Sequence, residues 1–424
     1  MTLVLLAAGI VILLLLRVPV GFAMLGPCLA YMLLNGQSIG LSVRLAANGV
    51  NSWPLLAVPL FILVGVIANR ASIADRLFEF ALSIVGRIRA SLGYVNIGVS
   101  LGFAWMSGAA LADAAGLGKV EVPAMIRNGY PRRFSVGITA ASTIIGPIMP
   151  PSIPAIIYAA IASVSTGALF ATSVVPALLL TVGLAVAVYI WGRSRPELAT
   201  SETSWRRFRS AGVGVIGVAV APVIILGGIL GGLFTPTEAA AVGAVYLLVL
   251  GLAYGDLRMR DVPGILVETA VTTAAISIIL AASALLGYIL AREQVPRLAA
   301  DALLGVTDSQ VVFLLLVNLL LILLGMVIEP TSALVISVPI LLPIATEFGV
   351  DPLHFGIIVI LNLMIGLLTP PVGAVLFVLS SVTGISVHEV FQGTAPFLIP
   401  LLIVLAIVTF APDLVLFLPR ALGL

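Results

Sequence analysis

The sequences Gly146-Pro147-Ile148-Met149-Pro150-Pro151-Ser152 and Gly366-Leu367-Leu368-Thr369-Pro370-Pro371-Val372 decide the fold of this chain. Each places two consecutive prolines inside a long apolar stretch, and the two copies lie 220 residues apart. Proline has no amide hydrogen to donate, and it pushes the residue before it out of helical geometry. Both stretches, at about 134–161 and 354–382, are therefore predicted to be discontinuous helices that unwind at the double proline.

The composition around these motifs predicts an all-α polytopic membrane protein. Of 424 residues, 61% are hydrophobic and 9% are charged, whereas soluble domains have about 45–50% apolar and about 25% charged residues. Apolar stretches long enough to cross a lipid bilayer recur along the whole chain. This composition excludes a soluble enzyme and a nucleic-acid binder. Because Cys28 is the single cysteine, it also excludes a disulfide-stabilised secreted domain.

The apolar stretches predict ten spans and two hairpins. The spans are expected at 2–16, 18–34, 54–69, 134–161, 170–191, 211–230, 238–254, 264–290, 354–382 and 393–418. Two further apolar segments, 91–118 and 309–345, contain small or acidic residues near their middle. Both are predicted to be re-entrant helical hairpins, whose tips face inward because irregular backbone at membrane depth needs partners from protein or water.

The placement of the arginines orients these elements. Basic residues cluster at 70–89, 119–133, 193–209 and 258–260, and the positive-inside rule predicts that all four clusters are cytoplasmic. They share one side only if segment 91–118 returns to the side from which it entered. The same reasoning places both termini outside and Arg17 inside.

The chain also repeats itself. Pro19 and Gly26 match Pro236 and Gly243 at an offset of 217, close to that of the double prolines. Residues 1–191 and 211–424 are therefore predicted to be two copies of one unit, joined by a cytoplasmic connector at 192–210. Equivalent spans run in opposite directions in the arginine-based topology, which predicts an inverted repeat. Secondary transporters use this architecture, with substrate and ion sites at discontinuous helices.

Oxygen atoms near the two breaks are candidate ligands for Na+. An unwound helix leaves carbonyl groups without partners, and a cation at membrane depth satisfies them. The side-chain candidates are Ser142, Thr143 and Ser152 for the first break, and Asn362 and Thr369 for the second, alongside the carbonyl groups that each break frees. Helix packing around two structural kinks is the alternative explanation.

The hairpin tips contribute the acidic candidates. Asp113 follows a run of small residues that begins at Ser107, and Glu329 precedes Pro330 and Thr331. Acidic residues within a membrane are functional candidates by default, so Ser107 and Thr331 join the two acids as predicted ligands. Alternatively, each acid caps the end of a helix at the membrane interface.

Other residues support fewer conclusions. Arg292 either pairs locally with Glu293 or meets a substrate carboxylate in bidentate fashion. Glu238, after Thr235, is predicted to take part in an N-terminal helix cap. The sequence contains no Walker-type phosphate loop and, with two histidines and one cysteine, no transition-metal cluster. An intramembrane enzyme or a passive channel remain the alternatives to a transporter.

At Ser107–Gly118, Gly146–Ser152, Ser163–Phe170 and Gly366–Gly373, the sequence resembles the large membrane subunit of the tripartite ATP-independent periplasmic (TRAP) transporters. The resemblance covers essentially the whole chain. It implies an elevator-type, Na+-driven importer of organic acids in the cytoplasmic membrane of a bacterium or archaeon. It also implies two partners: a small four-helix membrane subunit, here a separate polypeptide, and a periplasmic substrate-binding protein.

The resemblance also implies roles for individual residues. Ser107, Asp113 and Ser152 resemble residues of the family's substrate cavity. Gly146 and Pro150 resemble one sodium site of the family, and Glu329, Gly366 and Thr369 resemble the other. The alanines at 109 and 110 replace hydroxyl residues expected in the family. The transported acid, whether sialic acid, a C4-dicarboxylate or another, is expected to be selected mainly by the soluble partner, and no organic cofactor is expected.

Overall fold

The computed structural model describes residues 2–16, 18–85, 88–193, 195, 205–304, 307 and 309–424. Within these residues the protein is helical and contains no β-strand, as the composition predicts. Arg17 and Arg87, and most of the connector predicted at 192–210, lie outside the described residues.

The first part of the chain forms a run of helices that ends before the connector. In chain order these are α1 (Thr2–Leu15), α2 (Val20–Leu34), α3 (Ile39–Val50), η1 (Pro54–Leu56), α4 (Ala57–Arg70), α5 (Ile73–Val85), α6 (Ser91–Ser107), α7 (Ala110–Arg127), α8 (Arg132–Ser142), η2 (Thr143–Ile145), α9 (Ile153–Ala162) and α10 (Thr166–Gly192). Helices α6 and α7 form the first predicted hairpin, although α7 extends nine residues beyond its expected end at residue 118.

The second part repeats the same kinds of element. Its helices are α11 (Trp205–Pro222), η4 (Val223–Gly227), α12 (Gly228–Leu230), α13 (Pro236–Tyr254), η5 (Met259–Asp261), α14 (Val262–Arg292), α15 (Val295–Leu304), α16 (Gln310–Gly325), α17 (Pro330–Glu347), α18 (Pro352–Gly366), α19 (Ala374–Thr383), α20 (Val387–Phe410), α21 (Pro412–Val415) and α22 (Phe417–Ala421). Helices α16 and α17 form the second hairpin, and η4 is a π-helical segment.

Both double prolines interrupt a helix, as their chemistry predicts. The first break separates α8 and η2 from α9, and the second separates α18 from α19. The Pro150–Pro151 and Pro370–Pro371 peptide bonds are both cis. The helices resume at Ile153 and Ala374, so each break is a short irregular segment between two helical halves.

Three helices were not predicted, because their sequences lack a continuous apolar run. Segments 39–50, 73–85 and 295–304 lie outside the predicted spans and hairpins, and the structure contains α3, α5 and α15 there. Helix α5 carries Asp75, Arg76 and Glu79 among apolar residues, a pattern typical of an amphipathic helix. Charged residues that suggested a loop are therefore one face of a helix.

Five described helices are long and apolar enough to cross a membrane: α10, α13, α14 with η5, α17 and α20. Helix α3 and the segment Pro54–Arg70 together pass the same test as a sixth span, bent by 62°. The other predicted spans correspond to shorter apolar helices of 10–17 residues.

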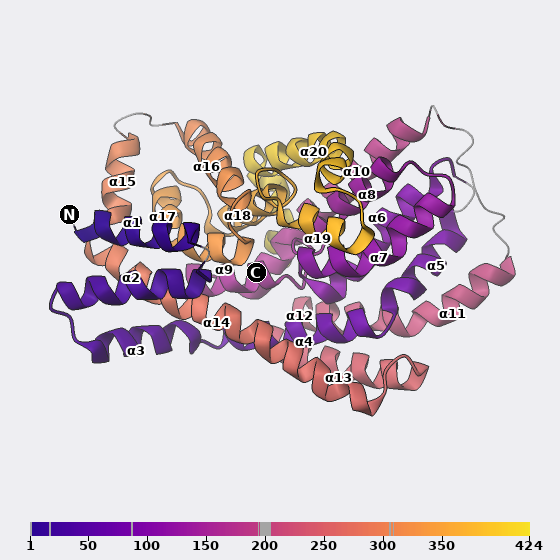
Figure 1. Cartoon of the computed structure of the whole chain (residues 1–424), viewed down its shortest axis with the longest axis horizontal. Helices are drawn as coiled ribbons and strands as arrows, with labels where there is room; N and C mark the ends of the chain where they lie inside the picture. The colour runs from indigo at the N-terminus through magenta and orange to yellow at the C-terminus, as the bar shows by residue number, and fades with distance from the viewer. Residues whose placement is uncertain are drawn as a thin grey trace.

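Helices from the two parts of the chain pack against one another in reciprocal pairs. Figure 1 shows α2 and α3 lying beside α14, while α4 packs on α13. Likewise, α7 of the first hairpin packs on α19, and α17 of the second hairpin packs on α9. The fully buried Tyr158 of α9 fills the space over Gly356 and donates a hydrogen bond to the Pro352 carbonyl at 2.6 Å. The two broken helices therefore share one core.

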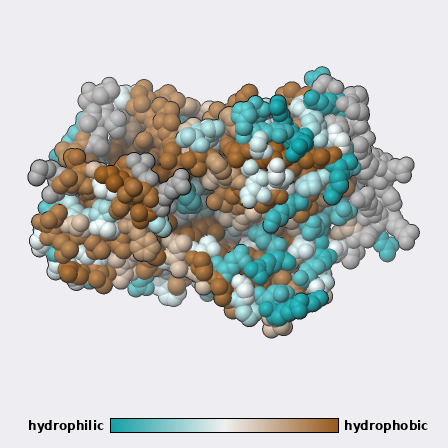
Figure 2. Space-filling model, in the orientation of Figure 1, coloured by the Kyte–Doolittle hydropathy of each residue, from teal (hydrophilic) through white to brown (hydrophobic). Residues whose placement is uncertain are grey.

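The face of the molecule seen in Figure 2 has a more hydrophobic side and a more hydrophilic side. Figure 2 shows hydrophobic residues gathered over the side that carries α1, α2 and α3, and more hydrophilic residues toward the side that carries α7 and α13. Between these sides the surface is hollowed. Large apolar side chains such as Val4, Ile12 and Leu34 are exposed on the first side, and exposed apolar patches of this kind mark membrane or protein contact surfaces.

Candidate functional site: two hairpin tips against two broken helices

The first hairpin turns at Gly108. Helix α6 ends at Ser107, Gly108 has a φ of +62°, and α7 begins at Ala110. A Cβ atom on Gly108 would lie 2.6 Å from the carbonyl oxygen of Pro151. Glycine is required here both for the left-handed backbone and for the close approach. The tip of the first hairpin therefore rests directly on the first double proline.

Asp113 places a carboxylate at this contact. Its side chain is 1% exposed, and Oδ1 has no hydrogen-bond partner among the described residues. Its other oxygen faces Gly146, where an added Cβ would overlap it. The hydroxyl of Ser107, beside this carboxylate, is also buried and unpaired within the described structure. Sequence analysis singled out Ser107 and Asp113 at the hairpin tip and Gly146 at the break, and the fold brings all three together.

The main chain of the first break adds further oxygen atoms. The amides of Ile148 and Met149 both donate to the Ile145 carbonyl, at 3.2 and 2.8 Å. Within the described backbone, no amide donates to the carbonyls of Gly146 or Pro150. These are the two positions whose main chain was predicted to serve a cation.

Ser152 and Thr143 use their hydroxyls locally. Ser152 is the N-cap of α9: its Oγ accepts from the Ala155 amide at 3.1 Å and donates to the Pro147 carbonyl. Thr143 donates to the Ala140 carbonyl at 2.8 Å. Both hydroxyls therefore stabilise the shape of the break, and each oxygen keeps a lone pair able to accept or to coordinate.

The second hairpin tip contacts the second break through backbone atoms. A Cβ on Gly366 would lie 2.5 Å from the carbonyl carbon of Gly325, so the two glycines let α16 and α18 approach closely. The Met326 carbonyl accepts from the amides of Val372 and Gly373, at 3.2 and 3.3 Å. These bonds fix the tip to the segment that follows the second double proline.

Glu329 lies at this tip in an environment unlike that of Asp113. It is the N-cap residue of α17, it is exposed, and its carboxylate accepts from the Ser332 amide at 3.0 Å and the Ser332 hydroxyl at 3.2 Å. Side-chain capping of this kind stabilises a helix start. Of the two roles considered for Glu329, this geometry is that of the helix cap. Thr331, two residues later, is buried.

Asn362 is the buried polar side chain of the second break. Its Nδ2 donates to the Ile358 carbonyl and to Oδ1 of Asn318, both at 2.7 Å. Its Oδ1 is buried without a partner among the described residues. Thr369 donates its hydroxyl to the Ile365 carbonyl at 3.0 Å, which leaves its oxygen able to accept or to coordinate.

Ser142 belongs to a buried network that contains an acid missed by sequence analysis. The Ser142 hydroxyl bonds to Ser100 and to Oδ1 of Asn96, both at 2.8 Å. Nδ2 of Asn96 donates to Thr139 at 2.7 Å and to the carboxylate of Glu121. Glu121 is fully buried. Its position between Lys119 and Arg127 suggested a cytoplasmic loop, and only its contact with Asn96 reveals its burial.

The two halves use asparagine in the same way. Asn96 of α6 and Asn318 of α16 each accept a hydrogen bond, through Oδ1, from the helix that precedes the break. Each donates through Nδ2 to a third helix: Asn96 to Glu121 of α7, and Asn318 to Thr409 of α20 at 3.0 Å. Each hairpin is thus fastened to its own broken helix by one buried asparagine.

The remaining predicted residues lie elsewhere. Arg292 is exposed at the end of α14, and within the described chain no ion pair joins it to Glu293. The expected local pair was wrong, because the Glu293 carboxylate accepts a hydrogen bond from Tyr31 of α2 instead. Glu238 forms a capping box with Thr235, as predicted.

These side chains offer oxygen ligands and no catalytic pair. The part of the chain that the structure describes contains no group of three or more His, Cys, Asp or Glu residues able to hold a metal together. Carboxylate, hydroxyl, amide and carbonyl oxygens suit hard cations. Two broken helices, each contacted by a hairpin tip, form the kind of site that secondary transporters use. Fold and site together define a membrane transporter.

Comparison with known proteins identifies the family. The model of the DctM component of the tripartite ATP-independent periplasmic transporters matches residues 7–414. The chain is 45% identical over 405 residues to the sialic acid TRAP transporter large permease protein SiaM of Vibrio cholerae, covering 95% of each chain. It is 38% identical over 402 residues to the C4-dicarboxylate TRAP transporter large permease protein DctM of Pseudomonas aeruginosa, covering 94% of each. The chain therefore belongs to the TRAP transporter large permease family.

Two further relatives are informative about organisation and fold. The sialic acid TRAP transporter permease protein SiaT of Haemophilus influenzae is 38% identical over 407 residues, which span 96% of this chain but 66% of that relative. The crystal structure of the Alcanivorax borkumensis YdaH transporter matches 87% of both chains with a TM-score of 0.62 and 15% identity. The similarity to YdaH concerns the fold alone.

The family model and the relatives are transporter permeases. As a member of this family, the chain is a transporter and not an enzyme.

Proposed function

We propose that this chain is the transport subunit of a Na+-coupled, binding-protein-dependent importer of a carboxylated solute. The observation that carries the proposal is the buried, unpaired carboxylate of Asp113 beside Gly146. An uncompensated carboxylate inside a membrane protein is costly, whereas a bound cation offsets that cost. Na+ is the coupling ion that this oxygen-only ligand set suits.

The proposed Na+ sites lie at the two contacts between hairpin tip and broken helix. At the first, the ligands are Ser107, Asp113 and the main chain of Gly146 and Pro150, with Ser142 holding the adjacent helix. At the second, they are Asn362, Thr369, Thr331 and the main chain of Gly366, while Glu329 caps the helix that forms the tip. Unpaired oxygens at Ser107, Asp113 and Asn362 support this assignment.

The proposed transport mechanism is an elevator built from two inverted repeats, residues 1–191 and 211–424. The reciprocal packing of α7 on α19 and of α17 on α9, and of α2 on α14 and of α13 on α4, supports this relationship. Helix α7 of the first repeat corresponds to α17 of the second, and α9 corresponds to α19. The contact of α7 with α19 is therefore the symmetry mate of the contact of α17 with α9. In an elevator, the part of the protein that holds the solute and its ions moves as a rigid body and carries them across the membrane together.

The solute is proposed to be sialic acid, a C4-dicarboxylate or a similar organic acid, because two relatives are named as transporters of sialic acid and of C4-dicarboxylates. Its carboxylate would lie near the first tip, where Ser107, Asp113-bound Na+ and Ser152 are grouped. Arg292, exposed at the end of α14, is assigned a lesser role in attracting the anion. The proposed partners are a small four-helix membrane subunit and a periplasmic substrate-binding protein. The proposed location of the chain is the inner membrane of a bacterium.

Reconstitution tests this function. Proteoliposomes containing the chain and its small subunit, supplied with loaded binding protein, are expected to take up solute only under an inward Na+ gradient. Uptake that is unchanged when choline replaces Na+ would contradict the coupling. Flux that neither saturates nor requires the binding protein would indicate a passive channel instead.

A further inference from the structure

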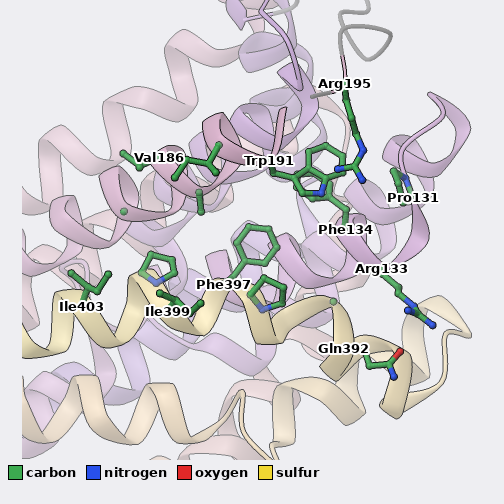
Figure 3. A pocket seen from close by; sticks show the side chains of 16 residues that line it. Pro131, Arg133, Phe134, Val186, Trp191, Arg195, Gln392, Phe397, Ile399 and Ile403 are labelled. Atoms are coloured by element: carbon green, nitrogen blue, oxygen red, sulfur yellow. The ribbon is translucent and has the colours of Figure 1, made fainter. Parts of the chain in front are cut away.

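A groove with no assigned role runs along α8, α10 and α20 (Figure 3). Its volume is about 620 Å³, and it shares no residue with the hairpin tips or the two breaks. The groove therefore needs an explanation other than the proposed Na+ and solute sites.

The walls of the groove are two apolar stripes. Val186 and Ile190 line it from α10, and Ile399 and Ile403 line it from α20. The members of each pair are four residues apart, so they lie on the same face of their helix. All four side chains are at least 50% exposed. In a membrane protein, such stripes face hydrocarbon chains rather than water.

The floor of the groove is closed and aromatic. Phe134 and Phe397 lie across it with ring centroids 5.8 Å apart, and both are buried. A Cβ on Gly183 would lie 3.5 Å from Cβ of Pro400, so α10 and α20 touch beneath the stripes. The groove is therefore a shallow channel rather than a gap that leads into the core.

One end of the groove is basic. Arg133, Arg195 and Gln392 lie toward one end of the groove in Figure 3, opposite Ile403, and the Arg133 side chain points away from that of Arg195. The Arg195 guanidinium lies 4.0 Å from the ring centroid of Trp191, which stacks on Phe134 at 3.5 Å. Within the described residues, neither arginine forms an ion pair. Two guanidinium groups without an ion pair to any described residue thus lie at one end of an apolar channel.

We propose that this groove binds one anionic phospholipid, with its phosphate at the end that carries Arg133 and Arg195 and an acyl chain along the α10 and α20 stripes. Arginine binds phosphate through paired N–H donors, and basic residues next to membrane helices select anionic headgroups. Trp191 lies beside Arg195, and tryptophan is the residue type favoured at the boundary between headgroups and hydrocarbon.

The shape and polarity of the groove favour a lipid over other occupants. A soluble organic acid would satisfy the two arginines but would leave the apolar stripes without a partner. A transmembrane helix of another protein would cover the stripes but would leave the guanidinium groups facing apolar side chains. A phospholipid matches both parts, because its charge is confined to one end.

Lipid titration of the purified full-length chain tests the proposal. Phosphatidylglycerol carrying brominated acyl chains is added in detergent, and quenching of tryptophan fluorescence is compared with that by brominated phosphatidylcholine. We expect the apparent affinity for phosphatidylglycerol to be about thirtyfold higher, from two basic contacts. The Trp191→Phe variant, which keeps an aromatic ring in the stack, is expected to lose this quenching component.

Two arginine variants separate a specific site from general charge attraction. Arg133→Gln/Arg195→Gln is expected to bind both lipids with affinities within about twofold of each other. Arg258→Gln/Arg260→Gln removes the same charge from exposed positions outside the groove and is expected to keep the preference. Equal binding of both lipids by the unmodified chain would overturn the proposal.

The remaining outcomes identify other occupants. Inorganic phosphate that displaces the brominated lipid as well as phosphatidylglycerol does would show a free-anion site and would overturn the lipid assignment. Displacement of the lipid by the purified small membrane subunit would show that the groove belongs to a protein interface, and would also overturn it.

Discussion

Asp113 and Glu329 each stand near the start of the second helix of a hairpin, yet their surroundings differ. Asp113 lies inside the first turn of α7, where its own amide already bonds to the Ala109 carbonyl, and its buried carboxylate faces Gly146. Glu329 precedes α17, is exposed, and bonds to Ser332. Asp113 lies a few residues further into its helix than Glu329 does. That difference leaves Asp113 without a hydrogen-bond partner for Oδ1 among the described residues, whereas Glu329 caps its helix. Of the two acids, our proposal therefore gives Asp113 a role in binding Na+ and Glu329 a role in holding the shape of its tip.

Asn96 and Asn318, the asparagine clamps that fasten each hairpin to its broken helix, also have different surroundings. Of the substitutions considered, their removal should lower the free energy of unfolding the most. Asn96→Ala is expected to lower the free energy of unfolding by about 3 kcal/mol or more, because it removes the hydrogen-bond donor of the buried Glu121 carboxylate. Asn318→Ala leaves only neutral groups, Asn362 and Thr409, without their partner. Its expected cost is about 1–3 kcal/mol. The shift in thermal midpoint of each purified variant measures the difference.

A second substitution checks the reason for this difference. In the Asn96→Ala background, Glu121→Gln removes the charge while keeping the shape of the side chain. It is expected to recover part of the lost stability. If Asn96→Ala and Asn318→Ala cost the same, and Glu121→Gln recovers nothing, the contrast between the clamps would be disproved.

Gly146→Ala should break the first tip without altering the second. The added methyl group would overlap the Asp113 carboxylate, and overpacking of this kind costs about 1–3 kcal/mol, so Na+-dependent uptake is expected to fall about tenfold or more. Gly287→Ala is the matched control, because nothing lies within 4 Å of its added Cβ. Equal uptake by the two variants would show that the contact of Asp113 with Gly146 is unimportant.

Glu329→Gln should have the smallest effect. Glutamine keeps an acceptor for the Ser332 amide, and the site is exposed, so stability is expected to fall by less than about 1 kcal/mol. Transport by this variant is expected to stay within about twofold of the unmodified protein. A loss of transport comparable to that of Gly146→Ala would mean that Glu329 acts as more than a cap.

The sequence predicted those features that local chemistry dictates. Proline cannot continue a helix, so both breaks were predicted at the double prolines and are found there. The small residues after Ser107 predicted a turn, which the structure makes at Gly108. The family was also evident, because the motifs around Asp113 and Pro150 are distinctive.

Features that depend on distant contacts were not predictable. Glu121 is buried only because Asn96 and Thr139 meet it. Glu293 bonds to Tyr31, which lies 262 positions earlier in the chain, so no local pattern indicates that partner. Helix α5 was missed because Asp75, Arg76 and Glu79 interrupt its apolar positions, while its ion pair with Asp256 at 2.8 Å is formed only in the folded chain.

Equilibrium binding of radioactive Na+ to the purified chain tests the central claim most directly. Asp113→Asn removes the charge of the first tip and Glu329→Gln that of the second, and both keep the shape of the side chain. The account predicts that Asp113→Asn binds fewer Na+ ions than the unmodified protein, whereas Glu329→Gln binds the same number. Full binding by Asp113→Asn, or a loss confined to Glu329→Gln, would contradict it.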